Sequence, residues 1–365
     1  MIGRLLKILS LTLMALLLVQ HAAMADTPAN NVDPNDITEG QGTQPSSGCP
    51  NFEAGHLPDE QNVTYKTYWS PPLQTNLNLG LDIYDPRPGG SGTFSAIVVS
   101  HGGGWKVGCR RSMAGFSWNA AGKNFIVFAI DYRLTCIYGQ PDLNVLCGSA
   151  SNPFTFANQP TDVKDAIQWV RNNAQAHLKA NQTFSGKVVA VGGSAGGSIT
   201  FMAGDTGTVG GTRPDLMAGF SPVPELGYMS DGNTACSVAY PNPGGVTLCT
   251  NNTTDYMAGA LTGTGQCGDS WAAGSPACNV NGTSLPPPTF MANATDDLVA
   301  YKAATDLQFK LDTFGVTEQL CTIGNNGPPW NSDSHLHGTQ LIDKTCPATG
   351  KTVFQSLFDF ISLHL

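Results

Sequence analysis

Short, continuously apolar segments alternate with helical patterns along most of this chain. In Ala96-Ile97-Val98-Val99 every position is apolar, which is typical of a strand that helices bury on both faces of a parallel sheet. Strands are expected at 79–84, 94–100, 125–130, 188–191, 217–220 and 289–291, and helices at 163–174, after residue 194, at 300–314 and at 352–363. The alternation predicts an α/β fold with a mostly parallel central sheet and helices on both faces.

Two other stretches depart from this alternation. Residues 26–58 are polar and rich in Asn, Pro, Gly and Ser, and we interpret them as a surface arm. Residues 222–286 are rich in Gly, Asn and Thr and contain four cysteines. They are expected to form a disulfide-rich loop excursion over the carboxyl edge of the sheet. The rest of 59–365 is expected to be one folded domain.

The N-terminus has the composition of a secretory signal. Arg4 and Lys7 precede an apolar stretch at 8–19, and Ala23-Met24-Ala25 matches the small-x-small pattern of a cleavage site. The apolar stretch is shorter than the roughly 20 residues that a membrane-spanning helix needs. We therefore expect cleavage after residue 25, a secreted or periplasmic protein, and no stable membrane insertion.

All ten cysteines follow the expected cleavage site. An even number in an oxidising compartment favours up to five disulfides, and no Cys-x-x-Cys pair suggests a metal site. The sequence leaves the pairing open. Pairing of neighbours would give 136–147, 236–249, 267–278 and 321–346, with Cys49 joined to Cys109.

The charge balance of the chain indicates which kinds of molecule it can bind. The chain has 18 basic and 27 acidic residues, a net charge of −9, and only 12% charged residues. An acidic chain lacks the positive surface on which nucleic-acid binding depends, so no nucleic-acid partner is expected.

Gly192-Gly193-Ser194-Ala195-Gly196 is a G-x-S-x-G motif between an expected strand and an expected helix. This context fits a nucleophile elbow, in which a strained turn exposes a serine and its neighbours must be almost free of side chains. Ser194 is therefore the candidate nucleophile. The alternative is a glycine-rich turn with a capping serine.

A second glycine cluster, His101-Gly102-Gly103-Gly104-Trp105, directly follows the strand at 94–100. Backbone N–H groups in such a loop can hold a developing oxyanion, and we assign this role to Gly102, Gly103 and Ala195. His101 is expected to support the loop rather than to transfer protons. A phosphate-binding loop is disfavoured because no Lys-Ser/Thr follows the glycines.

A nucleophilic serine needs a base, and His335, His337 and His364 lie downstream of Ser194. His337 is preferred because Gly338 allows a tight turn in a catalytic loop, and His335 is the alternative. His364 follows a helix at the end of the chain and is a poor candidate. A metal pair with Asp333 is the rival interpretation of the histidine cluster, although no further ligands lie nearby; no metal is expected.

The base in turn needs a carboxylate that orients it. Asp296 follows the expected strand at 289–292, at the carboxyl end where open parallel sheets build their sites. It is the preferred acid. Asp297 is the runner-up and could instead cap a helix, whereas Asp333 lies uncomfortably close in sequence to the histidines.

Motifs spread over residues 62–363 resemble those of the α/β-hydrolase superfamily. The similarity is to the bacterial carboxylesterase and feruloyl-esterase-like branch, which is related to hormone-sensitive-lipase-type esterases. It rests on 101–105, Asp131-Tyr132-Arg133-Leu134, Asp162-Val163, 168–174, 193–197, 273–276, 287–290 and 295–299. Lipase-type elbows usually have Asp before the serine, and Gly193 at that position fits the feruloyl-esterase-like branch better. The resemblance implies Ser194 as nucleophile, Asp296 as acid, His337 as base, and no cofactor.

Together these features predict a serine hydrolase that cleaves carboxylic esters by acyl transfer, with a small-molecule or polymer-linked ester as substrate. An amide or peptide hydrolase using the same residues is the alternative, because a triad does not select the leaving group. A non-catalytic binding protein with a hydrolase fold is the remaining alternative. Trp105 and Trp330 could line the substrate pocket or pack in the core.

Overall fold

The computed structural model describes the chain in nine segments, 56–70, 75–106, 108–135, 156–226, 256–257, 267, 270–297, 299–324 and 336–365. All of them belong to one compact unit, Asp33–Leu365. The expected signal sequence, most of the expected polar arm and much of 222–286 lie outside these residues. Within the described segments, no helix combines the length and the apolar character needed to cross a membrane.

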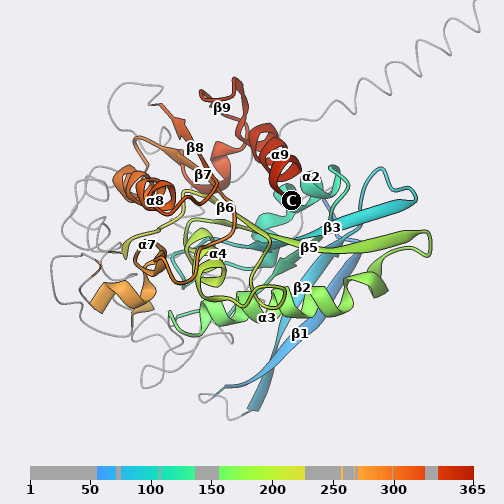
Figure 1. The fold of residues 1–365 in the computed structure, drawn as a ribbon. Coiled ribbons are helices and arrows are strands. Elements are labelled where there is room, and N and C mark those ends of the chain that lie inside the picture. Colours follow the sequence, from blue (N-terminus) through green and yellow to red (C-terminus); the bar gives the residue numbers. More distant parts are fainter. Residues whose placement is uncertain are drawn as a thin grey trace, which may run out of the picture. The chain divides into compact units, whose positions relative to one another are not determined.

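An eight-stranded sheet forms the centre of the fold (Figure 1). Its strands are β1 (Glu60–Ser70), β2 (Thr75–Tyr84), β3 (Gly92–Ser100), β4 (Ile126–Ile130), β5 (Gln182–Gly193), β6 (Leu216–Phe220), β7 (Thr289–Ala294) and β8 (Glu318–Ile323). The order is β1-β2-β4-β3-β5-β6-β7-β8, and at one edge β1 pairs antiparallel with β2, which in turn pairs antiparallel with β4. The other six strands are parallel, so the expected mostly parallel sheet is confirmed.

Helices cover both faces of this sheet (Figure 1). They are α2 (Ala114–Ala121), α3 (Gln159–Asn173), α4 (Ala195–Thr206), α7 (Pro276–Asn279), α8 (Tyr301–Thr313) and α9 (Val353–His364). Single turns η2 (Arg110–Met113), η3 (Ala174–His177), η5 (Ser270–Gly274) and η6 (Gly338–Leu341), and a small hairpin of β9 (Thr345–Cys346) and β10 (Lys351–Thr352), complete the described elements. Helices α3, α4 and α8 pack on one face, and α2 and α9 on the other. Helices therefore cover both faces of each strand in the middle of the sheet, which explains the runs of apolar residues in these strands.

Helix α3 buries the face that its sequence periodicity predicts. The five apolar residues on that face, Val163, Ala166, Ile167, Val170 and Ala174, are all fully buried. In the first turn, the buried carboxylate of Asp162 accepts hydrogen bonds from Arg133 Nη2 at 2.7 Å and Nε at 2.8 Å, and from Lys66 Nζ at 2.6 Å. The Asp162 and Arg133 motifs thus attach α3 to β1 and to the segment after β4, and their role here is structural.

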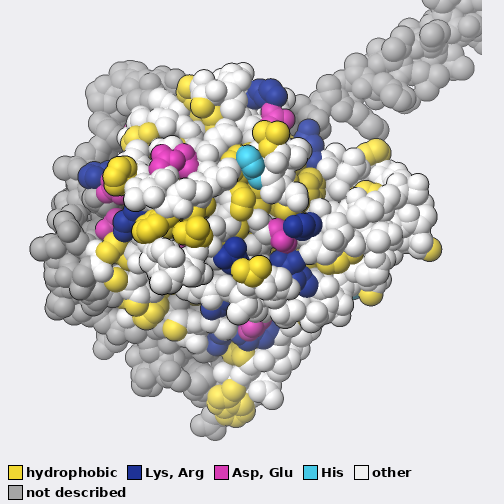
Figure 2. All heavy atoms as spheres, viewed as in Figure 1, with side chains coloured by type: hydrophobic (Ala, Val, Ile, Leu, Met, Phe, Trp, Pro, Cys, Tyr) yellow, Lys and Arg dark blue, Asp and Glu magenta, His cyan; other side chains and the backbone are white. Residues whose placement is uncertain are grey.

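The visible surface carries few charges. In Figure 2, neutral polar and backbone atoms cover most of the described surface on this side, and charged side chains lie among them in small separate groups. This distribution matches the 12% share of charged residues in the sequence.

Candidate functional site

Ser194 lies on a sharp turn between the end of β5 and the start of α4. Its backbone angles are φ 52° and ψ −123°, a conformation that L-residues rarely adopt. The Ser194 N–H donates to the carbonyl of Phe220 on the neighbouring strand β6 at 2.8 Å. The backbone strain expected for a nucleophile elbow is therefore present and is held by the sheet.

The glycines that flank Ser194 are required by close backbone contacts. A Cβ on Gly192 would lie 2.3 Å from the carbonyl carbon of Gly196, and a Cβ on Gly196 would lie 2.3 Å from the carbonyl oxygen of His101. No side chain can be accommodated at such distances. The same contacts press the first turn of α4 against the end of β3, which carries the second glycine cluster.

The loop after β3 places Gly102 directly beside the serine. A Cβ on Gly102 would lie 3.3 Å from the Ser194 Cβ. Gly103, Gly104 and Trp105 all have positive φ, so the chain turns sharply here. Ala195 begins α4, where backbone N–H groups have no acceptor inside the helix. The loop after β3 and the first turn of α4, which contain the candidate oxyanion donors, therefore both lie next to Ser194.

His101 and Trp105 are buried supports of this loop. The His101 Nδ1–H donates to the Gly102 carbonyl at 2.7 Å, its ring stacks on Tyr132 at 4.2 Å, and the Tyr132 hydroxyl donates to the His101 carbonyl at 2.9 Å. Trp105 is only 2% exposed and stacks on Tyr256 at 4.5 Å, which corresponds to core packing. Trp330, the other tryptophan considered for the substrate pocket, lies outside the described residues.

Burial of the His101 imidazole lowers its pKa. The unfolded chain therefore takes up a proton at this histidine near pH 6.5, whereas the folded chain does so only at lower pH. The stability that the neutral ring contributes is complete above pH 6.5 and is lost as the pH falls below it. We expect His101→Asn to flatten the fall in unfolding free energy between pH 6.5 and 5 by up to about 1.4 kcal/mol per pH unit. Urea titrations across this range measure the slope. His364→Asn, at an exposed position, is the control, and an unchanged slope in His101→Asn would contradict the prediction.

His337 contacts Asp297, and the preference for Asp296 is corrected accordingly. The His337 Nδ1–H donates to Asp297 Oδ1 at 2.6 Å, and the Val299 N–H donates to the same oxygen at 3.0 Å. Both side chains of the His337–Asp297 pair are buried, whereas Asp296 is only half-buried.

The position of Asp297 follows from the length of β7. The strand continues to Ala294, and the Thr295 N–H still bonds the Ile323 carbonyl of β8 at 2.9 Å. The sequence predicts a shorter strand, so the point at which the chain leaves the sheet lies later than expected. Residue 297, rather than 296, then turns towards the histidine.

Sequence reasoning missed Ser221, which also contacts Asp297. Ser221 follows β6 directly, is fully buried, and has φ 48°. Its hydroxyl donates to Asp297 Oδ2 and accepts a hydrogen bond from the Gly338 N–H at 2.7 Å. A signal was available, because Ser221 ends a buried strand as Ser194 does, but no catalytic motif surrounds it.

The remaining candidates lie apart from this cluster or outside the described residues. His364 is at the end of α9, where its ring packs on Phe360 at 4.5 Å. His335 and Asp333 are not among the described residues. One described group has the residue types that bind metals, Glu225 with Cys267 and Cys278, but the two sulfurs are joined to each other. A disulfide lacks the thiolate that serves as a metal ligand.

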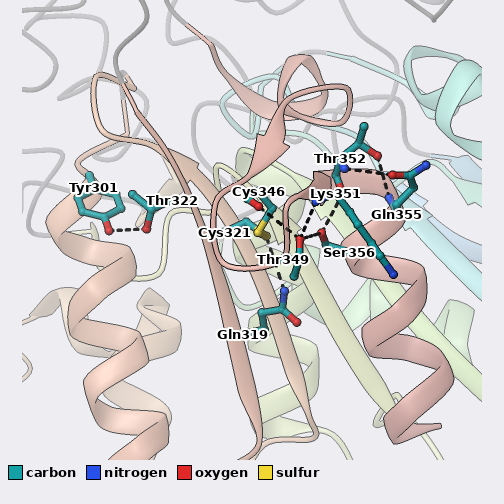
Figure 3. The surroundings of a disulfide bond; sticks show 10 residues. All are labelled: Tyr301, Gln319, Cys321, Thr322, Cys346, Thr349, Lys351, Thr352, Gln355 and Ser356. Atoms are coloured by element: carbon teal, nitrogen blue, oxygen red, sulfur yellow. Dashed lines mark hydrogen bonds between the residues drawn. A yellow bond between two sulfur atoms is a disulfide. The ribbon is translucent and has the colours of Figure 1, made fainter.

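Two of the expected disulfides are confirmed. Cys267 pairs with Cys278, and Cys321 on β8 pairs with Cys346 on β9 (Figure 3). Cys109 is also in a disulfide, with a partner outside the described residues, and none of the described cysteines is free. The expected pairs 136–147 and 236–249 lie outside the described residues. The Cys321–Cys346 disulfide closes the segment that contains His337.

We expect removal of the Cys321–Cys346 disulfide to reduce activity before it unfolds the protein. A bridge that spans 25 residues contributes about 3 kcal/mol by restricting the unfolded chain, and here that segment carries His337. In Cys321→Ala/Cys346→Ala, ester hydrolysis should fail at a lower urea concentration than far-UV circular dichroism. The control Cys267→Ala/Cys278→Ala removes a bridge that does not enclose His337. Simultaneous loss of activity and structure would contradict the prediction.

Comparisons with known proteins agree with this fold. The BD-FAE family matches residues 81–311 of the chain. Thermogutta terrifontis esterase 2 phosphonylated by sarin has a TM-score of 0.57 at 20% identity over 86% of this chain and 96% of that one. The same esterase with bound butyrate has a TM-score of 0.54 at 21% identity, over 85% of this chain and 95% of that one. An inhibited esterase B from Lactobacillus rhamnosis has a TM-score of 0.56 at 18% identity, over 84% of this chain and 88% of that one. No curated protein matches the sequence significantly. The resemblance to α/β hydrolases is confirmed, and at these identities the structural likeness concerns the fold.

Proposed function

Because the chain belongs to the BD-FAE family, we propose that it is a secreted serine esterase that hydrolyses carboxylic esters through an acyl-enzyme on Ser194. The observation that carries the proposal is the strained Ser194 at the carboxyl ends of the strands, beside a glycine loop and at the edge where the buried His337–Asp297 pair forms. Backbone strain at a serine costs folding free energy, and a turn that only connects a strand to a helix does not need that strain.

The hydrogen bond to Asp297 determines how His337 can act. Because Nδ1 carries the proton that is donated to the carboxylate, Nε2 holds the free electron pair and is the basic atom. In the first step, Ser194 Oγ attacks the ester carbonyl carbon and its proton passes to His337 Nε2. The Asp297 carboxylate stabilises the imidazolium that forms.

Backbone donors then stabilise the charge on the substrate oxygen. The N–H groups of Gly102, Gly103 and Ala195 bind the oxyanion of the tetrahedral intermediate. As the carbon–oxygen bond to the alcohol breaks, His337 returns the proton to the leaving oxygen. Water repeats the sequence on the acyl-enzyme, so that the carboxylic acid is released and Ser194 is regenerated. Every proton in this scheme moves between groups of the chain, the substrate and water.

The relatives of similar fold and the disulfides support different parts of the proposal. Thermogutta terrifontis esterase 2 forms adducts with sarin and paraoxon, reagents that esterify nucleophilic hydroxyl groups. Disulfides persist in oxidising compartments, so the two described pairs support export of the chain.

Covalent labelling tests the proposed nucleophile. Diisopropyl fluorophosphate should form an O–P bond to Ser194 and release fluoride, with the serine proton passing to His337. Intact mass and peptide mapping should locate one adduct per chain on Ser194, with parallel loss of activity on p-nitrophenyl acetate. Activity that survives complete labelling, or an adduct on another residue, would contradict the proposal.

Substrate specificity is tested with a graded set of esters. p-Nitrophenyl esters of increasing acyl length and methyl ferulate separate short-acyl from aromatic-acyl preference. The p-nitroanilide with the best acyl group tests the alternative of amide cleavage. A rate on the anilide that matched the ester would favour that alternative.

A further inference from the structure

Ser221 has a strained backbone that the sheet alone does not require. Its φ of 48° lies in the left-handed region, which glycine adopts without cost. Its N–H donates to the Ala292 carbonyl at 2.8 Å, and a glycine could make the same backbone bond. A serine kept at such a position indicates that its side chain is needed there.

The hydrogen bonds of Ser221 close a ring around the His337–Asp297 pair. The hydroxyl has one proton, and since a carboxylate only accepts, that proton is donated to Asp297 Oδ2. The hydroxyl oxygen accepts the N–H of Gly338, the residue after His337, at 2.7 Å. His337 completes the ring through its bond to Asp297 Oδ1 at 2.6 Å. Each donor of the ring therefore has an acceptor within the ring, and the side chains of Ser221, Asp297 and His337 are all buried.

We propose that Ser221 is a positioning residue that holds Asp297 and the backbone of the histidine loop in the register that directs His337 towards Ser194. The proposal deepens and rests on the proposed esterase function. The His337 Nδ1–H and the Val299 N–H both donate to Oδ1 of Asp297, and neither bond holds Oδ2 or the backbone of Gly338. Ser221 fixes the second carboxylate oxygen and the residue next to His337 at the same time.

The placement of Ser221 excludes direct contact with the substrate. The side chain is fully buried, and both hydrogen-bonding partners of its hydroxyl belong to the ring. Ser194 and Ser221 directly follow the adjacent strands β5 and β6, both have positive φ, and the Ser194 N–H bonds the carbonyl of Phe220, which precedes Ser221. Ser194 is thus half-buried at the turn where it would react, and the fully buried Ser221 after the next strand supports the acid and base.

Variants of Ser221 separate its hydroxyl from its backbone. Ser221→Ala and Ser221→Gly both remove the hydroxyl, but Gly also relieves the positive φ. We expect kcat on p-nitrophenyl acetate, and the rate of Ser194 phosphorylation by diisopropyl fluorophosphate, to fall about 10- to 100-fold in both, with KM nearly unchanged. Ser221→Thr keeps the hydroxyl but places a β-branched residue at positive φ. It should lower the melting temperature yet retain kcat per folded molecule close to that of the wild type.

A control and an independent signal complete the test. Ser117→Ala removes a hydroxyl from α2 that is equally buried and has no hydrogen-bond partner among the described residues, and its activity should be unchanged. The proton on His337 Nδ1 should give a far-downfield NMR signal in the wild type that shifts or broadens in Ser221→Ala but not in Ser117→Ala.

The outcomes distinguish this inference from the proposed function. Wild-type kcat and phosphorylation rate in both Ser221→Ala and Ser221→Gly would overturn the positioning role. Equal loss of melting temperature and activity in all three Ser221 variants would do so as well, because it would indicate a purely structural role. Absence of an adduct on Ser194 in the wild type would instead refute the esterase proposal, and the NMR signal would still report whether Ser221 orders the His337–Asp297 pair.

Discussion

Ser194→Ala is expected to lower kcat for ester hydrolysis by roughly 10⁴- to 10⁶-fold, since the variant has no atom that can form the acyl-enzyme. The oxyanion donors and the His337–Asp297 pair remain, so a slow, direct attack by water is the only route left. Initial rates on p-nitrophenyl acetate, measured at saturating substrate, check the size of the loss.

The matched control for this variant is Ser198→Ala. Ser198 lies one turn further along α4, and its hydroxyl is buried and has no hydrogen-bond partner in the part of the chain that the structure describes. We expect it to keep nearly full activity. Thermal unfolding of both variants should show a folded protein, because Ala retains the Cβ of serine and leaves the elbow backbone unchanged. Equal rates in the wild type and Ser194→Ala would exclude catalysis at this elbow.

The sequence predicts those elements of the fold whose signal lies in residues that are close together in the sequence. Strand β4 and residues 96–99 of β3 are continuously apolar, and α3 repeats its apolar residues with helical spacing, so each can be recognised without knowledge of its neighbours. The elbow at Ser194 is equally local, because the glycines that its turn requires are adjacent to it.

Other elements have weaker local signals. Strand β1 interleaves polar residues such as Thr64 and Lys66 with its aromatic ones, as an edge strand does, and the prediction does not single it out. Helix α2, with the sequence AGFSWNAA, has no clear apolar stripe, and its position is decided by packing against the sheet and against Phe354 of α9.

The acid and its support depend on contacts that are distant in sequence. Asp296 and Asp297 are adjacent, and the choice between them depends on how far β7 continues its pairing with β8. Ser221 bonds Asp297 across 76 residues and Gly338 across 117. No periodicity or motif around a single serine encodes contacts of this kind, so the ring around the His337–Asp297 pair emerges only from the folded chain.

We expect Asp297→Asn to lower kcat by roughly 10³- to 10⁴-fold, and Asp296→Asn to leave it close to the wild-type value. The asparagine has almost the shape of aspartate, but its amide group donates where the carboxylate accepts. If the amide NH₂ faces His337, the ring must turn its lone pair to Nδ1 and place the proton on Nε2, the atom that has to accept the Ser194 proton. In either orientation the negative charge that stabilises the imidazolium is absent.

The paired variants decide the identity of the acid because they make the same chemical change at adjacent positions that differ in burial and contacts. Asp297 accepts from His337, Val299 and Ser221, whereas Asp296 is half-buried and lies one residue before this network. Steady-state kinetics on p-nitrophenyl acetate, with thermal unfolding to establish that both variants are folded, provide the comparison. A large loss in Asp296→Asn together with an active Asp297→Asn would mean that the chain reacts from a different arrangement of this loop. A selective loss in Asp297→Asn would instead tie the rate to the carboxylate on His337, because only that variant loses the negative charge and the acceptor for Nδ1–H that hold the imidazole in its reactive form.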